Sequence, residues 1–159
     1  MPDQTEPPVV GTHNGFEIYP MPMFATMQTR DVNALSQWYQ AALGFAVMFE
    51  GPEIDGQPVL IHLRRRKYQD VLLKLAHSTG PAPQMTGLSI YFQAGESVDA
   101  IATRAAAITA PGIAAVQSPT NTHWSTREVQ ITDPDGRLLI FSEPRFDSKK
   151  LSGLERPNL

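Results

Sequence analysis

Hydrophobic and polar residues follow the same order of patterns twice along the 159-residue chain. In each half, a short apolar run is followed by a stretch with apolar residues three or four positions apart, and then by further apolar runs between turns. The three-to-four spacing is typical of one helix face, whereas short apolar or alternating runs are typical of strands. The pattern therefore predicts two copies of a β-α-β-β-β unit and indicates an internal duplication.

The first half contains a helix with clear signals at both ends. Apolar positions after Asp31 recur at helical spacing as far as Gly44. An aspartate can accept a hydrogen bond from a free N–H of the first turn, and glycine readily adopts the left-handed conformation that ends helices. Strands are predicted on both sides of this helix, at residues 21–29, 45–49, 58–63 and 71–75.

The second half repeats this order and ends in a hairpin. Ser97 is the expected N-cap of a second helix, and Gly112 is its expected stop. The turn that contains Asp135 and Gly136 follows an alternating stretch and precedes an apolar run. An Asp-Gly pair suits a hairpin turn because glycine accepts a positive φ. Strands are predicted at residues 88–92, 113–116, 128–132 and 138–141.

These elements define the domain organisation. The predicted modules occupy residues 19–77 and 85–145, and a linker rich in Ser, Thr, Gly and Pro joins them at residues 78–84. A flexible N-terminal arm is expected at residues 1–18 and a polar C-terminal tail at residues 146–159. The predicted fold class is α+β, with two tandem βαβββ modules forming a curved mixed sheet with a cleft.

Composition narrows the classes of partner. The formal net charge is −3, and the one dense basic cluster, Arg64-Arg65-Arg66-Lys67, is interpreted as a solvated strand end, so no nucleic acid is expected. There is no cysteine, which excludes disulfides and thiolate sites. Neither a long apolar run nor a signal-peptide pattern is present. We therefore expect a cytoplasmic protein with no membrane partner.

The duplicated pattern resembles the vicinal oxygen chelate superfamily, which includes glyoxalases, extradiol dioxygenases and bleomycin-resistance-type proteins. The resemblance covers residues 21–144. It rests on Arg30-Asp31 before a helix that ends in Leu-Gly-Phe, and on the Thr-Asp-Pro-Asp-Gly-Arg-Leu-Leu-Ile-Phe run at residues 132–141. It implies the fold of two βαβββ modules that the pattern also predicts.

The resemblance also bears on metal binding. Catalytic members of that family hold a divalent metal with His, Glu or Gln side chains at four equivalent strand positions. Carried over by resemblance, these positions are Phe24, Lys74, Gly87 and Ile140. Phe, Gly and Ile side chains offer no donor, and a charged lysine repels a cation. The resemblance therefore implies no metal and no cofactor, as in the bleomycin-resistance branch.

The leading hypothesis is a homodimer that binds a small aromatic or amphipathic molecule, for example an antibiotic. Drug-binding relatives often carry a tryptophan near the cleft, and Trp124 stands nine residues before Asp133. Stacking on an indole contributes about 0.5 to 1.5 kcal/mol beyond area burial. An equally supported interpretation of Trp124 is an edge residue that covers the core. The predicted ligand-binding residues are Phe24, Phe49, His62, Lys74, Tyr91, Trp124, Arg127 and Ile140.

Two other interpretations stay open. In the first, the chain is an enzyme. It is either a metal-dependent lyase, isomerase or dioxygenase whose metal ligands lie elsewhere in the sequence, or a metal-free enzyme that uses Lys74 or His62. Alternatively, the cleft is closed and the domain is an interaction module. Metal analysis of the purified protein and Trp124 fluorescence with planar ligands distinguish these hypotheses.

Overall fold

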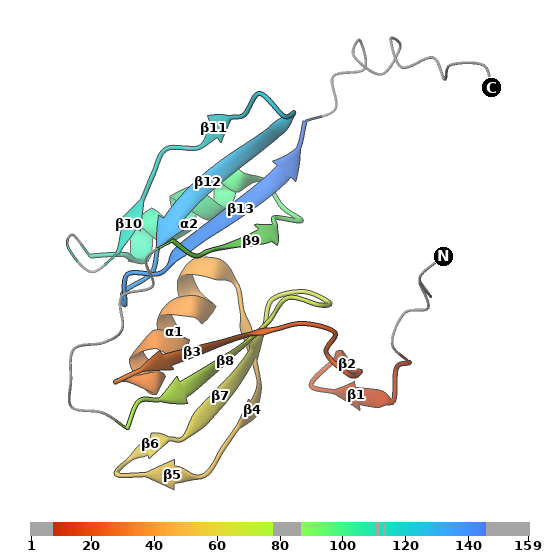
Figure 1. Ribbon diagram of the computed structural model, residues 1–159, viewed down its shortest axis with the longest axis vertical. Coiled ribbons are helices and arrows are strands. Elements are labelled where there is room, and N and C mark those ends of the chain that lie inside the picture. Colours follow the sequence, from red (N-terminus) through yellow and green to blue (C-terminus); the bar gives the residue numbers. More distant parts are fainter. Residues whose placement is uncertain (1–7, 78–86, 111, 113, 146–159) are drawn as a thin grey trace. The chain divides into compact units, whose positions relative to one another are not determined.

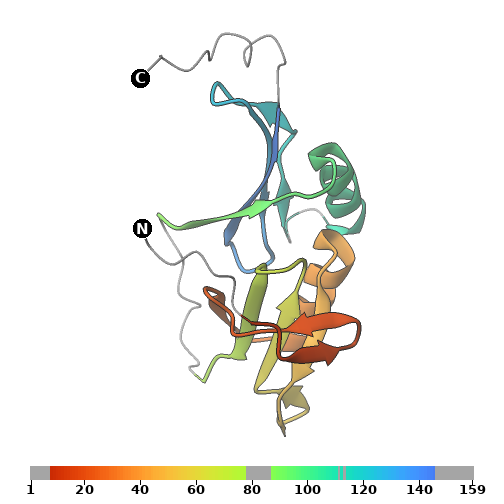
Figure 2. The same cartoon turned by 90° about the vertical axis from the view of Figure 1, so that its right-hand side faces the viewer.

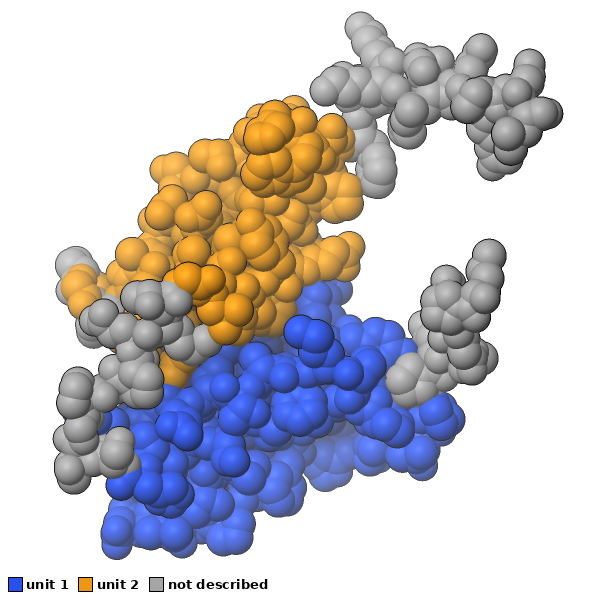
Figure 3. All heavy atoms as spheres, viewed as in Figure 1, with its two compact units in different colours: residues 1–83 blue, residues 84–159 orange. Residues whose placement is uncertain are grey.

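Each half of the chain folds into a mixed sheet with one helix packed against it. The computed structural model describes residues 8–77, 87–110, 112 and 114–145. These residues belong to two compact units, residues 1–83 and residues 84–159 (Figure 3). The element order β-α-β-β-β occurs in both units (Figure 1). The predicted α+β class and the predicted pair of βαβββ modules are therefore confirmed.

In unit 1, the strand order of the sheet is β3-β8-β7-β4. Strand β3 runs parallel to β8, whereas β8 pairs antiparallel with β7 and β7 pairs antiparallel with β4. Helix α1 contacts β7 and β8, and its side chains complete the core of the unit. The elements are β3 (Ala25–Thr29), α1 (Val32–Leu43), β4 (Ala46–Glu50), β5 (Glu53–Ile54), β6 (Gln57–Pro58), β7 (Leu60–Arg64) and β8 (Asp70–Leu75).

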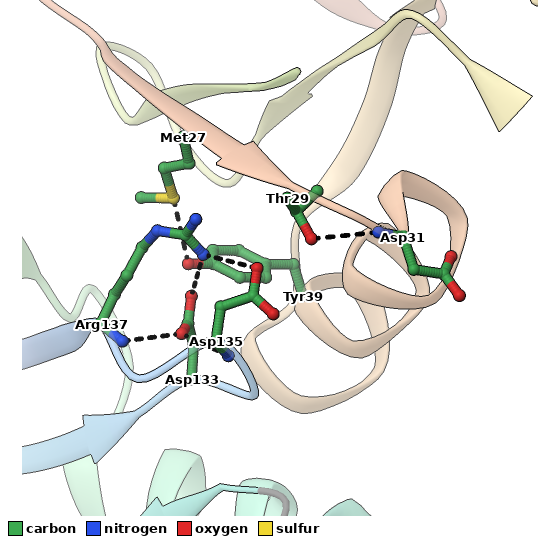
Figure 4. A network of polar contacts seen from close by, with 7 residues as sticks. All are labelled: Met27, Thr29, Asp31, Tyr39, Asp133, Asp135 and Arg137. Atoms are coloured by element: carbon green, nitrogen blue, oxygen red, sulfur yellow. Dashed lines mark hydrogen bonds and ion pairs between the residues drawn. The ribbon is translucent and has the colours of Figure 1, made fainter. Parts of the chain in front are cut away.

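Helix α1 begins and ends where its local sequence predicts. The Ala34 backbone N–H donates to Asp31 Oδ1 at 2.8 Å, which satisfies one of the free donors of the first turn. Gly44 follows the last helical residue in the left-handed conformation, with φ at 75°. The tyrosine of the helix, Tyr39, is fully buried and donates its hydroxyl to Met27 Sδ at 3.3 Å. This contact ties the helix to β3 (Figure 4).

Part of the expected N-terminal arm has a regular structure. Strands β1 (Gly11–His13) and β2 (Phe16–Ile18) form an antiparallel hairpin. Its turn residues, Asn14 and Gly15, both have positive φ, at 49° and 79°. An Asn-Gly pair is the preferred sequence for such a two-residue turn, so this hairpin has a local sequence signal. Residues 1–7 of the arm lie outside the described residues.

The basic cluster at the end of β7 is not a solvated strand end, and that interpretation is wrong for its first two residues. Arg64 is only 3% exposed, and its Nε lies 2.7 Å from Asp70 Oδ1. Arg65 is 8% exposed and donates from Nε to the backbone oxygen of Leu43 at 2.9 Å, at the end of α1. Both guanidinium groups are held inside the unit because each finds an acceptor there.

In unit 2, the strand order is β10-β12-β13-β9, and β11 also pairs with β12. Strand β13 runs parallel to β9 and antiparallel to β12, which repeats the relationships in unit 1. Helix α2 contacts β10, β12 and β13, and it lies against one face of the sheet (Figure 2). The elements are β9 (Ser89–Gln93), α2 (Val98–Ile108), β10 (Ala115–Val116), β11 (Thr120–Asn121), β12 (Thr126–Thr132) and β13 (Leu138–Pro144).

The second helix differs from its prediction in its caps. Ser97 stands at the N-cap position, but its side chain makes no capping hydrogen bond. The helix ends at Ile108, with Thr109 as C-cap, so Gly112 is not the residue that stops it. The predicted linker at residues 78–84 and the predicted tail at residues 146–159 lie outside the described residues. Within the described part of the chain, neither helix has the length and hydrophobicity that crossing a bilayer requires.

The hairpin between β12 and β13 is organised by Asp133. Its Oδ1 accepts from the backbone N–H groups of Asp135 at 3.0 Å and Arg137 at 2.8 Å. Its Oδ2 pairs with Arg137 Nη1 at 3.2 Å (Figure 4). Gly136 has φ at 87°, a value that an L side chain rarely adopts. The predicted Asp-Gly turn is therefore confirmed, and a side-chain carboxylate holds it closed.

Candidate functional site

Helix α1 packs against one face of the unit 1 sheet. Met27, Leu73 and Ile61 are neighbours across β3, β8 and β7 and are buried beneath α1. Because side chains alternate along a strand, the residues between them point to the opposite face. His62 of β7 and Lys74 of β8 belong to this second set. Any chemistry carried by these strands is therefore on the face that α1 does not cover.

A hollow of about 460 Å³ lies in unit 1 beside β4 and β7. Its walls are mainly apolar or aromatic, and its polar side chains are those of two histidines, one arginine and one tyrosine. Strand β4 reaches it with two consecutive side chains because a β-bulge between Val47 and Phe49 interrupts the pairing with β7. The lining residues are His13, Ile18, Tyr19, Pro20, Met21, Met48, Phe49, His62 and Arg64.

The polar end of the hollow is built on a buried carboxylate. The side chain of Asp70 is fully buried, and its Oδ1 lies 2.7 Å from both His62 Nε2 and Arg64 Nε. The Tyr19 hydroxyl donates to Asp70 Oδ2 at 3.4 Å and accepts from the Tyr68 backbone N–H at 2.6 Å. Burial raises the pKa of Tyr19, and the charge of Asp70 adds to this shift.

Arg64 connects this carboxylate to the N-terminal hairpin. Its guanidinium carbon lies 4.2 Å from the centre of the Tyr19 ring, and Nη1 donates to the Glu17 backbone oxygen. Lys67 reinforces the contact through an ion pair with the Glu17 carboxylate at 3.1 Å. The hairpin is thereby fastened beside the hollow. This accounts for His13 and Ile18 among the lining residues.

His62 is the residue of this group with a defined chemical capacity. Its side chain is 16% exposed and lines the hollow, while Nε2 is engaged by Asp70. A carboxylate that accepts a hydrogen bond from Nε2 orients the imidazole, which leaves the other ring nitrogen, Nδ1, to meet a ligand. Nδ1 can then accept a hydrogen bond or a proton from a ligand.

A second polar group lies in unit 2 around Glu128 of β12. This residue is only 6% exposed, and three donors converge on its Oε1. They are Thr126 Oγ1 at 2.8 Å, Trp124 Nε1 at 3.1 Å and Ser142 Oγ at 3.3 Å. Trp124 itself is 56% exposed, so its ring is presented to the surface while its N–H is held by the carboxylate.

The predicted ligand-binding residues fall into separate places. In unit 1, Phe49 and His62 face each other across β4 and β7 and both line the hollow. Phe24 precedes β3 and Lys74 is exposed on β8, and neither lines the hollow. Unit 2 holds the other four. Tyr91 and Ile140 are register partners on β9 and β13, whereas Trp124 contacts Glu128 and Arg127 contacts α2.

Arg127 is directed to the helix side of the unit 2 sheet. Its Nε and Nη2 each lie 2.7 Å from one oxygen of Asp99 in α2, and Nη1 donates to Asn121 Oδ1 at 2.9 Å. The Arg127 guanidinium holds the pKa of the Asp99 carboxyl below its usual range. Its neighbour Glu128 points to the other face, as strand alternation requires.

Sequence reasoning missed Tyr19, Arg64, Asp70 and Glu128. Asp70 had a local signal, since it is an acidic residue directly before an apolar strand and close to a basic cluster. Glu128 is the first residue of an alternating run, and nothing nearby in the sequence shows that its carboxylate is buried. Two of its donors, Trp124 and Thr126, lie within four residues, whereas the third, Ser142, is brought to it by the pairing of β12 with β13.

The four positions that the family resemblance assigns to metal ligands carry no suitable donor side chain. Phe24 and Ile140 offer only hydrocarbon, Lys74 is an exposed ammonium, and Gly87 has no side chain and a φ of 83°. Divalent metals require oxygen, nitrogen or sulfur donors. Over the described residues, no three or more His, Asp and Glu side chains gather in an arrangement that could hold an ion.

Comparison with known proteins gives a family and a fold. The sequence model of the Glyoxalase/Bleomycin resistance protein/Dioxygenase superfamily matches residues 23–141. No curated protein sequence matches the chain significantly. Solved structures do match, at identities that show the fold alone.

Three solved structures illustrate this likeness. TioX from Micromonospora sp. ML1 has a TM-score of 0.60 at 18% identity, covering 79% of this chain and 97% of that one. A bleomycin resistance determinant encoded on transposon Tn5 has a TM-score of 0.58 at 17% identity, covering 78% and 98%. A glyoxalase-related enzyme from Clostridium phytofermentans has a TM-score of 0.59 at 16% identity, covering 83% and 99%.

Proposed function

The chain belongs to the Glyoxalase/Bleomycin resistance protein/Dioxygenase superfamily, and within it we propose a cytoplasmic homodimer that binds a small aromatic or amphipathic molecule without a metal ion. The observation that carries this proposal is the hollow of unit 1. Its volume of about 460 Å³ is in the range of small-molecule sites. Its apolar walls with a few placed polar groups are also typical of such sites.

The chemistry of the walls suggests the class of ligand. Phe49 and Tyr19 supply aromatic surface, and Met48 and Met21 supply flexible thioether chains that adapt to different shapes. His62 stands at the polar end, where its Nδ1 can accept a hydrogen bond from a hydroxyl or amino group. A planar ring carrying one such group matches this combination of surfaces.

Antibiotic sequestration is the biological form of this proposal. The structure named as a bleomycin resistance determinant shares the fold of this chain, which supports that role by analogy. The residues present at the four metal-binding positions of catalytic relatives support it independently, because none can act as a ligand to a divalent ion. The proposed protein then holds its ligand unchanged and releases it unchanged.

Binding is tested by titrating the protein with bleomycin and with the planar dye anilinonaphthalenesulfonate. We expect Phe49→Ala to weaken dye binding about tenfold, because it removes an aromatic wall. Ile54→Ala is the matched control, since Ile54 is an exposed apolar residue outside the hollow. Equal affinities for the wild type and Phe49→Ala would contradict binding in this hollow.

The Asp70–His62 pair favours a second candidate, a metal-free enzyme that uses His62 as a general base. An imidazole oriented by a buried carboxylate, with its second nitrogen available beside a hollow, is the arrangement that proton abstraction needs. Transfer of deuterium from solvent into the carbon next to the carbonyl of aromatic ketones would reveal this activity. We expect His62→Gln to abolish it, whereas a purely binding protein shows no exchange in either form.

A further inference from the structure

The charge of Glu128 is unusual for a residue so deeply placed in unit 2. Its three hydrogen-bond donors are an indole N–H and two hydroxyls, all of them neutral. Burying a carboxylate is unfavourable unless hydrogen bonds and an opposite charge compensate for lost hydration. The three donors supply the hydrogen bonds, but they do not supply a positive charge that compensates for the carboxylate.

The nearby arginines do not neutralise it. Arg127 is the next residue in the sequence, yet it points to the opposite face and is occupied by both oxygens of Asp99. Arg145 lies near the residues that precede β12, because its backbone N–H donates to the Ser125 backbone oxygen at 2.8 Å. Among the described residues, neither arginine forms an ion pair with Glu128. The carboxylate therefore lacks a cationic partner within the part of the chain that the structure describes.

The second oxygen of Glu128 is available for such a partner. All three hydrogen bonds are made by Oε1, and no described residue donates to Oε2. Oε2 is also not among the fully buried side-chain atoms that lack a partner in the described residues. It therefore keeps a path to the surface. The three donors on Oε1 fix the orientation of the carboxylate.

Trp124 places an aromatic surface beside this oxygen. Its Nε1 is held 3.1 Å from Glu128 Oε1, and more than half of its side-chain surface is exposed. The His123 ring packs edge-on at 4.5 Å between centroids, which restricts the indole on one side. A fixed, exposed indole next to a carboxylate can attract a cation through its ring face and through the negative charge together.

We propose that Glu128 and Trp124 form a binding site for an organic cation. The ammonium group would lie against Oε2, and the apolar body of the molecule would lie on the indole ring. The site lies wholly in unit 2, so it does not depend on the hollow of unit 1. The ligand class that it selects is an amine or quaternary ammonium carried by an apolar or aromatic group.

The test uses three probes of similar size that differ in charge: the cation benzylammonium, the neutral benzyl alcohol and the anion benzoate. Trp38 and Trp124 are the two tryptophans of the chain. A Trp38→Phe background therefore makes fluorescence report on Trp124 alone. We expect benzylammonium to change this signal saturably and benzoate to leave it unchanged. Preference for benzoate over benzylammonium would overturn the proposal.

The decisive variant is Glu128→Gln, which keeps the side-chain length and an oxygen acceptor while removing the charge. We expect it to weaken benzylammonium binding by a factor on the order of ten or more. The matched control is Asp99→Asn, which removes a carboxylate on the helix side of the same unit and should leave the affinity unchanged. Equal affinity of Glu128→Gln and wild type would overturn the proposal.

Two further variants keep the test informative if Glu128→Gln does not fold. Trp124→Ala alters an exposed side chain, and we expect it to weaken benzylammonium binding. The shift of the ligand's NMR signals measures this binding without tryptophan fluorescence. Phe49→Ala should leave this binding unchanged, although it weakens the dye that reports on the hollow of unit 1. Failure of one site is thereby distinguishable from failure of the other.

Discussion

His62 Nε2 and Asp70 Oδ1 lie 2.7 Å apart on the adjacent strands β7 and β8. The same oxygen meets Arg64 Nε at 2.7 Å, and the Asp70 side chain is fully buried. Arg64 is the direct register partner of Asp70, and His62 is two residues earlier on the same strand face. One buried carboxylate thus orients two of the polar side chains that line the hollow of unit 1, those of His62 and Arg64.

Replacing Asp70 by Asn should strongly destabilise unit 1. The change leaves Arg64 buried without its ionic partner, and breaking a buried pair in this way typically costs about 3 to 5 kcal/mol. Urea unfolding followed by circular dichroism measures the loss. Glu96→Gln is the control, because the Glu96–Arg104 pair is partly exposed and should contribute at most about 1 kcal/mol. Similar losses in both variants would show that burial of Asp70 is not the cause.

The two helix N-termini offer a matched comparison. Asp31→Ala removes the hydrogen bond from the Ala34 N–H and should lower the free energy of unfolding by about 1 kcal/mol. Ser97→Ala changes the corresponding position of α2, where the side chain makes no capping bond. We expect the Ser97 variant to unfold at nearly the wild-type urea concentration. A larger effect at Ser97 than at Asp31 would contradict the observed caps.

The turn at Asp133 should respond in two steps. Asp133→Asn keeps an oxygen for the Asp135 and Arg137 N–H groups but loses the ion pair with the Arg137 side chain. Asp133→Ala loses all of these contacts and should cost about 1 to 3 kcal/mol more, since buried donors are left unsatisfied. Hydrogen exchange of the Arg137 amide supplies a local measurement. Exchange should be fastest in the Ala variant, and equal rates in both variants would refute the role of the carboxylate.

Acid should weaken the contact between α2 and β12. Hydrogen bonding to Arg127 lowers the pKa of Asp99 in the folded protein below its ordinary value of 3.8. The stabilisation from this pair is therefore complete above the ordinary pKa of the unfolded chain and is lost as the pH falls through the lower, folded value. An NMR titration of the Asp99 carboxyl carbon measures the shift. In Arg127→Gln, Asp99 should titrate near its ordinary value; an unchanged midpoint would exclude Arg127 as the cause.

The features that the sequence predicted correctly are local ones. Asp31 and Gly44 bound α1 because a helix cap involves residues within one turn of each other. The Asp-Gly turn before β13 was predictable for the same reason, since its bonds join residues two to four positions apart. The Asn14-Gly15 hairpin carries an equally local signal, although the prolines around it favoured the interpretation of an arm.

The features that the sequence did not predict depend on strand pairing. A run of basic residues is usually solvated, and the burial of Arg64 follows only from its position opposite Asp70 on the next strand. Arg127 and Glu128 could be assigned to opposite faces by alternation, but not to the helix side or the open side. Which residue takes which face depends on where α2 packs. Arg127 is on the helix side, where it pairs with Asp99, and Glu128 is on the open side, where it contacts Trp124.

The sequence by itself determined the duplicated α+β architecture and the absence of donor side chains at Phe24, Gly87 and Ile140, because periodicity and residue type require no knowledge of distant neighbours. Only the tertiary structure decided which polar groups meet. His62 joins Asp70 through the pairing of β7 with β8, and Ser142 joins Glu128 through the pairing of β12 with β13. The physical reason is that a buried charge takes its partners from whatever the packed strands place within hydrogen-bond distance, and that distance is unrelated to separation along the chain.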